Sequence, residues 1–93
     1  MSQTIYLIFD KVAGSVLGAP MLFPNDLSAK RELASLAADK STIVGRSPYD
    51  FDIVSPGILD LETGDIDKPT VGFTRFVCRM VDLLPRHSGD GDD

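Results

Sequence analysis

The stretch from residue 57 to residue 66 constrains the fold most, because it contains both halves of a β-hairpin signal. Two apolar arms flank a polar turn, and Gly64 supplies the positive φ angle that a type I turn followed by a bulge requires. The side-chain oxygen of Asp60 can cap this turn, and Glu62 and Thr63 tolerate its helical dihedral angles. We therefore expect an antiparallel hairpin here.

A chain of 93 residues is long enough for one domain with a modest core. We expect that domain to span residues 1–84, and residues 85–93 to form a disordered acidic tail. Nine Lys and Arg against 14 Asp and Glu give a net charge of −5. This balance argues against a protein that coats nucleic acid by charge alone, but it allows a local basic face.

Residues 4–9 are β-branched and aromatic and are apolar on both faces, which predicts a central strand. Several glycines and prolines in residues 14–24 permit a loop or a short strand there, but no long helix. Residues 41–48 are expected to be a linker. In residues 48–54, Tyr49, Phe51 and Ile53 alternate with Asp50 and Asp52, which predicts a strand with one buried and one wet face.

An amphipathic helix is predicted from Asp26 to about Lys40, with Asn25 as its N-cap. The carboxylate of Asp26 is favourable beside the positive end of the helix dipole. Apolar residues then recur at i, i+4, i+7 and i+8, so one face of the helix can pack on a sheet. These residues are Ala29, Leu33, Leu36 and Ala37.

The segment 71–84 fits two structures. As a helix, it places its apolar residues on one face with Arg75 and Arg79 opposite; as a strand, it is rich in Val, Phe, Thr and Cys. The strand is favoured, because a hairpin and one central strand alone make a narrow sheet. The predicted fold class is α+β: a small antiparallel sheet with one amphipathic helix packed on one face, in the order strand, helix, strand, strand, strand.

The sequence predicts no enzyme activity, metal site or cofactor. The only histidine, His87, lies in the expected tail, and Cys78 lies in an apolar segment where a core position is expected. The carboxylates around the hairpin turn lack the glycine position and the closing glutamate of a calcium loop. The single cysteine excludes an internal disulfide, and no basic start precedes a long apolar run, so the cytoplasm is expected and membrane contact is not.

Four segments occur in a fixed order between residues 6 and 66. They are YLIFDK from Tyr6 to Lys11, Asn25-Asp26 with Ala29 and Arg31, Pro48-Tyr49-Asp50-Phe51, and Gly57-x-x-Asp60-x-x-Thr63-Gly64-Asp65-Ile66. In this order they resemble the small nonstructural protein of gokushovirus-type microviruses, which are single-stranded DNA phages. The loop at 14–18, Leu61 in the turn and the segment after Lys68 depart from that pattern. The resemblance implies a DNA-binding or packaging-associated role in the cytoplasm of an infected bacterium, without enzyme activity.

Two functions from different classes follow. The first is an accessory protein that binds single-stranded DNA between replication and packaging, with aromatic side chains for base stacking and cations for phosphate. The candidates are Tyr49 and Phe51 for stacking and Lys30, Arg31, Arg46, Arg75 and Arg79 for phosphate. Against this function, residues 50–67 hold six acidic residues and no basic residue, which is a poor surface for DNA.

The second function is a small interaction module that binds another phage or host protein, or itself. The segment 71–84 adds more apolar surface than one small core can cover, and no proline guards it against edge pairing. We therefore expect a symmetric homodimer. The predicted interface consists of Phe73, Phe76, Val77, Met80, Val81 and Leu84.

Overall fold

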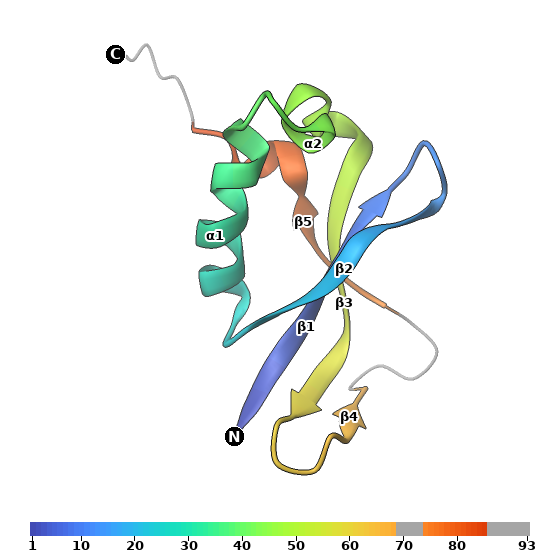
Figure 1. Ribbon diagram of the computed structural model, residues 1–93, viewed down its shortest axis with the longest axis vertical. Helices are drawn as coiled ribbons and strands as arrows, with labels where there is room; N and C mark the ends of the chain where they lie inside the picture. Colours follow the sequence, from blue (N-terminus) through green and yellow to red (C-terminus); the bar gives the residue numbers. More distant parts are fainter. Residues whose placement is uncertain (69–73, 86–93) are drawn as a thin grey trace.

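The computed structural model describes residues 1–68 and 74–85, and it shows an antiparallel sheet with α1 packed on one side (Figure 1). The elements are β1 (Ser2–Asp10), β2 (Ser15–Phe23), α1 (Asp26–Ala38), α2 (Ile43–Arg46), η1 (Pro48–Asp50), β3 (Phe51–Asp60), β4 (Ile66–Asp67), β5 (Arg75–Arg79) and η2 (Met80–Leu83). The predicted α+β class is confirmed. Residues 86–93 of the predicted tail lie outside the described residues.

The strands form one sheet in the order β2-β1-β3-β4, and β5 also pairs with β3. All pairs are antiparallel, with Ile8 opposite both Leu17 on β2 and Ile53 on β3. β5 and β4 therefore occupy successive parts of the same side of β3, at residues 52–55 and 58–59. As predicted, the strand that begins the chain is central.

β2 is a complete strand of nine residues, where a loop or a short strand was expected. It lies at the edge of the sheet, where glycine and proline are tolerated because no further strand needs their backbone groups. Gly18 has a φ angle of 75°, and the register with β1 shifts between Tyr6 and Ile8. Along the chain, two strands therefore precede α1 and three strands follow it, whereas one strand was predicted before the helix.

α1 begins and packs as predicted. The side chain of Asn25 accepts a 2.9 Å hydrogen bond from the backbone N–H of Ser28, which caps the first turn. Ala29, Leu33 and Ala37 are buried against the sheet. The core between the two layers is completed by residues from both of them: Tyr6, Ile8, Val44, Phe51, Ile53, Cys78 and Met80.

Residues 41–50 contain two short helices, α2 and η1, so the predicted linker is wrong. Thr42 caps α2 by accepting a 3.0 Å hydrogen bond from the backbone N–H of Gly45. A Cβ atom on Gly45 would overlap the backbone carbonyl of Asp39, so this position requires glycine. Tyr49 belongs to η1 and not to the predicted strand, which begins at Phe51.

The predicted hairpin is present between β3 and β4. The backbone N–H of Gly64 donates a 2.8 Å hydrogen bond to the carbonyl of Asp60, and the φ angle of Gly64 is 82°. The Asp60 side chain accepts a 2.9 Å hydrogen bond from the backbone N–H of Glu62. Near the C-terminus, the favoured strand is confirmed for residues 75–79, and the chain continues as the 3-10 helix η2.

Candidate nucleic-acid interface

Charged side chains are divided unevenly between two parts of the molecule. Residues 26–50 and 74–85, which we call the helical half, contain six Lys and Arg against five Asp and Glu, a net +1. Residues 1–25 and 51–68 contain two Lys and Arg against six Asp and Glu, a net −4. All five cations predicted to bind phosphate belong to the helical half. They are Lys30, Arg31, Arg46, Arg75 and Arg79.

Arg75 is held by an ion pair with Asp26. Its guanidinium group donates two hydrogen bonds to this carboxylate, at 2.8 and 2.9 Å, and so joins β5 to the first turn of α1. Hydrogen bonds from Arg75 lower the pKa of Asp26 to about 2, and the hydroxyl group of Tyr6 contributes a further one of 2.6 Å. Most of the charge of Arg75 is therefore balanced within the fold.

Arg79 is paired in the same way with Asp82 in η2, through hydrogen bonds of 2.8 and 3.2 Å. The hydrogen bonds from Arg79 lower the pKa of Asp82 below its ordinary value, and the charge of Lys30 lowers it further. Lys30 also lowers the pKa of Asp26. Lys30 therefore lies near both ion pairs, and its amine adds a third positive charge to this cluster.

Arg31 and Arg46 are exposed on α1 and α2. Arg46 donates a 3.2 Å hydrogen bond to the backbone carbonyl of Ser41, which orients its side chain without neutralising it. Lys40, also exposed in the helical half, was not among the predicted cations. Its position one residue after the C-cap of α1 was the signal that could have identified it, since cations favour this end of a helix.

The two aromatic candidates have opposite environments. Tyr49 is 70% exposed on η1, and its ring is available for stacking. Phe51 is 1% exposed in the core, so the prediction that it stacks on bases is wrong. The physical reason is that β3 begins at Phe51 and points this side chain toward α1, whereas the preceding 3-10 turn carries Tyr49 outward.

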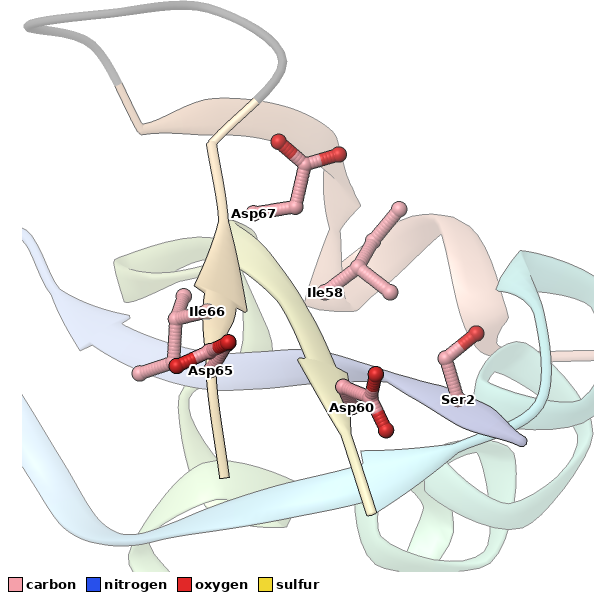
Figure 2. Close-up of a pocket in the computed structure, with 6 residues that line it drawn as sticks. All are labelled: Ser2, Ile58, Asp60, Asp65, Ile66 and Asp67. Atoms are coloured by element: carbon pink, nitrogen blue, oxygen red, sulfur yellow. The ribbon is translucent and has the colours of Figure 1, made fainter. Parts of the chain in front are cut away.

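The acidic hairpin end has a shallow hollow of about 450 Å³. Figure 2 shows its lining, to which β1, β3, β4 and the hairpin turn contribute. The lining residues are Ser2, Ile58, Asp60, Asp65, Ile66 and Asp67. Within residues 1–68 and 74–85, no group of three His, Cys, Asp or Glu side chains is placed to hold a metal ion. The carboxylates of Asp60, Asp65 and Asp67 make the hairpin end unsuitable for binding phosphate.

The described members of the predicted dimer interface differ widely in exposure. Met80 is 0% exposed in the core, so its assignment to an interface is wrong, because η2 turns it inward beneath α1. Val77, Val81 and Leu84 are half-buried, and Val77 and Leu84 pack against the same core. Phe76 is 56% exposed. Phe73 lies outside the described residues.

Residues 3–83 match a family of bacteriophage proteins. The family model is that of the Phage ORF5 protein, and the chain belongs to this family. The phage origin expected from the resemblance is therefore confirmed, while the narrower assignment to gokushovirus-type microviruses stays a prediction. No curated protein and no solved structure matches the chain. None of the helices in the described parts of the chain is long and apolar enough to cross a membrane.

Proposed function

We propose that this phage protein is a nonstructural accessory protein that binds single-stranded DNA with its helical half, between genome replication and packaging in the infected cell. The observation that carries this proposal is the division of charge. Six of the eight Lys and Arg side chains in the described residues lie in the helical half, and the acidic hairpin lies in the other part. The resemblance to microvirus nonstructural proteins supports the same function.

The phosphate contacts come from Lys30, Arg31, Lys40 and Arg46. In the parts of the chain that the structure describes, these four cations make no ion pair within 4.0 Å. Their charge therefore remains for phosphate groups. Tyr49 supplies a stacking platform near Arg79, and an exposed ring of this kind contributes about 1–3 kcal/mol per base.

Arg75 and Arg79 have a different role in this proposal. Because Asp26 and Asp82 neutralise them, Arg75 joins β5 to α1 and Arg79 joins β5 to η2, rather than binding phosphate. Binding through about four cations and one aromatic ring is modest in strength and independent of sequence. Such a protein can associate with a nascent strand and dissociate again as the genome is packaged.

The protein acts by binding and not by catalysis in this proposal. Its one thiol, Cys78, is buried in the core, and burial raises the pKa of that thiol above its ordinary value. A thiol of this kind is a poor nucleophile at neutral pH, because only the thiolate is reactive.

A salt series tests the proposal. Binding of a fluorescent single-stranded 20-mer should weaken as salt rises from about 50 mM to 200 mM. A plot of the logarithm of the binding constant against the logarithm of the salt concentration should have a slope of about −3, as expected for contacts to four phosphates of a single strand. A duplex of the same sequence serves as the control and should bind less tightly, because its bases cannot stack on Tyr49. No binding of the single strand at 50 mM salt would contradict the proposal.

A second candidate function is a protein interaction module that never contacts DNA. It is favoured by an exposed apolar surface on the side of the sheet away from α1, which includes Phe76. The salt series separates the two candidates. A folded protein that binds no single-stranded DNA but still binds a phage or host protein through this surface would favour the second one.

A further inference from the structure

The sheet has an apolar second face on the side away from α1. On β1, Tyr6 and Ile8 pack in the core, so the alternation of a strand turns Ile5, Leu7 and Phe9 to the opposite side. Their partners on neighbouring strands are apolar too: Leu22 lies opposite Ile5, Val16 opposite Phe9, Val54 opposite Leu7, and Phe76 opposite Val54. We call these seven residues the outer face.

None of the helices within residues 1–68 and 74–85 packs on the outer face, because α1 lies on the other side of the sheet (Figure 1). Three members of the outer face remain well exposed: Phe76 at 56%, Val16 at 45% and Leu22 at 42%. They come from both margins of the face, on β5 and β2, and between them lie Ile5, which is buried at 9% exposure, and the half-buried Leu7, Phe9 and Val54. Exposed apolar side chains at both margins of one sheet face are typical of an interaction site.

Charges on this side of the sheet are few and balanced. Asp52 and Arg79 lie opposite each other at one end of the face. Arg79 is paired with Asp82, and Nζ of Lys11 lies 3.3 Å from the buried Oδ1 of Asp52, which accepts no hydrogen bond from the described residues. By contrast, Asp60 and Asp67 of the hairpin lie in register with Ser2 and Ile58, which are not members of the outer face.

This distribution favours a second copy as the partner. Although the chain carries a net charge of −5, two outer faces can meet without bringing unpaired carboxylates together. An acidic chain that met itself through the hairpin end would instead place eight carboxylates from Asp60, Glu62, Asp65 and Asp67 near one another. Self-association through the outer face therefore avoids the electrostatic penalty.

Edge pairing is a less suitable route to self-association. The outer edge of β2 is interrupted by Gly18, which has a φ angle of 75°, and by Pro20, which has no N–H to donate. Interruptions of this kind prevent one edge strand from pairing with another. The β2 edge is therefore a poorer surface for self-association than the outer face.

The outer face is small, so self-association through it is weak. From Ile5 to Phe9 on β1 it is about 17 Å long, and its four strands make it about 19 Å wide, or roughly 320 Å² in projection. This is well below the ~800 Å² per partner of a standard interface. Because area alone does not fix affinity, the dissociation constant has to be measured over a wide range of concentration.

We infer that a second copy of this chain packs on the outer face, sheet against sheet, and forms a two-fold symmetric sandwich with its sheets about 10 Å apart. α1, which carries Lys30 and Arg31, then lies on the far side of each sheet and stays accessible in the dimer. The inference itself stands on the outer face and not on DNA binding.

Sedimentation velocity between about 2 and 200 μM tests this inference. The wild-type protein should change from a 10.1 kDa monomer to a dimer across this range. Phe76→Asp should weaken the dimer about 30-fold or more, because it replaces the most exposed aromatic ring of the face with a charge, and Leu22→Lys should weaken it independently. The matched control is Leu27→Asp, which places the same charge at a 70% exposed leucine on α1 and should leave the dimer unchanged.

Two results would overturn the inference. A monomer at every concentration would mean that another partner covers the outer face, and a dimer that survives both Phe76→Asp and Leu22→Lys would place the interface elsewhere. Both positions are exposed, so the variants should fold, and their far-UV circular dichroism and melting temperatures verify this. Binding of single-stranded DNA is measured separately, so a failure of the proposed function would leave the dimer result standing, and the reverse also holds.

Discussion

The hydroxyl group of Tyr6 on β1 donates a 2.6 Å hydrogen bond to Asp26, the first residue of α1. Tyr6 is fully buried, so without this acceptor its hydroxyl group would lose a partner inside the core. Burial and this bond together raise the pKa of Tyr6 to about 12. Because Asp26 also accepts two hydrogen bonds from Arg75, one carboxylate joins the central strand, the main helix and β5.

Removal of this carboxylate should destabilise the protein. Asp26→Ala is expected to lower the free energy of unfolding by about 2 kcal/mol at pH 7, because a buried hydroxyl group and a guanidinium group both lose their acceptor. The expected loss of stability is no larger because the Asp26 side chain is 40% exposed, and water partly screens its interactions. Urea denaturation measures the change. Glu32→Ala, at an exposed position on α1, is the control and should change stability by less than about 0.5 kcal/mol.

The same carboxylate predicts how stability depends on pH. Hydrogen bonds from Arg75 depress the pKa of folded Asp26 from 3.8 to about 2. A depressed pKa stabilises the folded state above pH 3.8, and this stabilisation is lost as the pH falls through about 2. Arg75→Ala should therefore flatten the decline in stability between pH 5 and pH 2. Equal slopes for the variant and the wild type would show that Arg75 does not set this pKa.

Gly64 tests the hairpin turn. Its φ angle is 82°, and an added Cβ atom would meet nothing within 4 Å, so only backbone strain opposes a larger residue. Gly64→Val should cost about 1 kcal/mol or more, because a β-branched residue resists positive φ. Gly64→Asn should cost less, since asparagine tolerates this region. Thermal denaturation compares them, and an unchanged stability of Gly64→Val would mean that Gly64 is not held at positive φ in this turn.

Local signals in the sequence predicted the parts of the fold that local chemistry determines. The cap at Asn25 and the apolar period from Ala29 to Ala37 identified α1, and Asp60 with Gly64 identified the hairpin turn. β2 was underestimated because its glycines and prolines indicate a loop, although an edge strand tolerates them. Whether a strand lies at an edge depends on the whole sheet, which no local pattern reveals.

The candidate site was predicted only in part, for a similar reason. Residue type selected five of the six cations of the helical half, but the pairing of Arg75 with Asp26 joins residues 49 positions apart and could not be read locally. The alternation of Tyr49 with Phe51 suggested that both rings share a face. A 3-10 turn before Phe51 separates them, because the period of a strand applies only within the strand.

The opposite environments of these two rings give a paired prediction. Phe51→Ala should cost about 3–5 kcal/mol of stability, because it leaves a cavity in the core. Tyr49→Ala should change stability by less than about 0.5 kcal/mol but weaken single-stranded DNA binding about 5- to 150-fold, the loss of one stacked base. Calorimetry and fluorescence anisotropy measure the two effects. A stable Tyr49→Ala protein with wild-type affinity would remove this ring from the interface.

The charge of the helical half is the centre of the functional account, and its neutralisation is the most direct test. The triple variant Arg31→Gln, Lys40→Gln, Arg46→Gln changes three exposed side chains and should fold normally. Lys68→Gln, in the acidic part of the molecule, is the control. We predict that the triple variant loses most of its affinity for a single-stranded 20-mer, with a salt slope shallower by about 2, while Lys68→Gln keeps the wild-type slope. A triple variant with the wild-type affinity and slope would contradict the account.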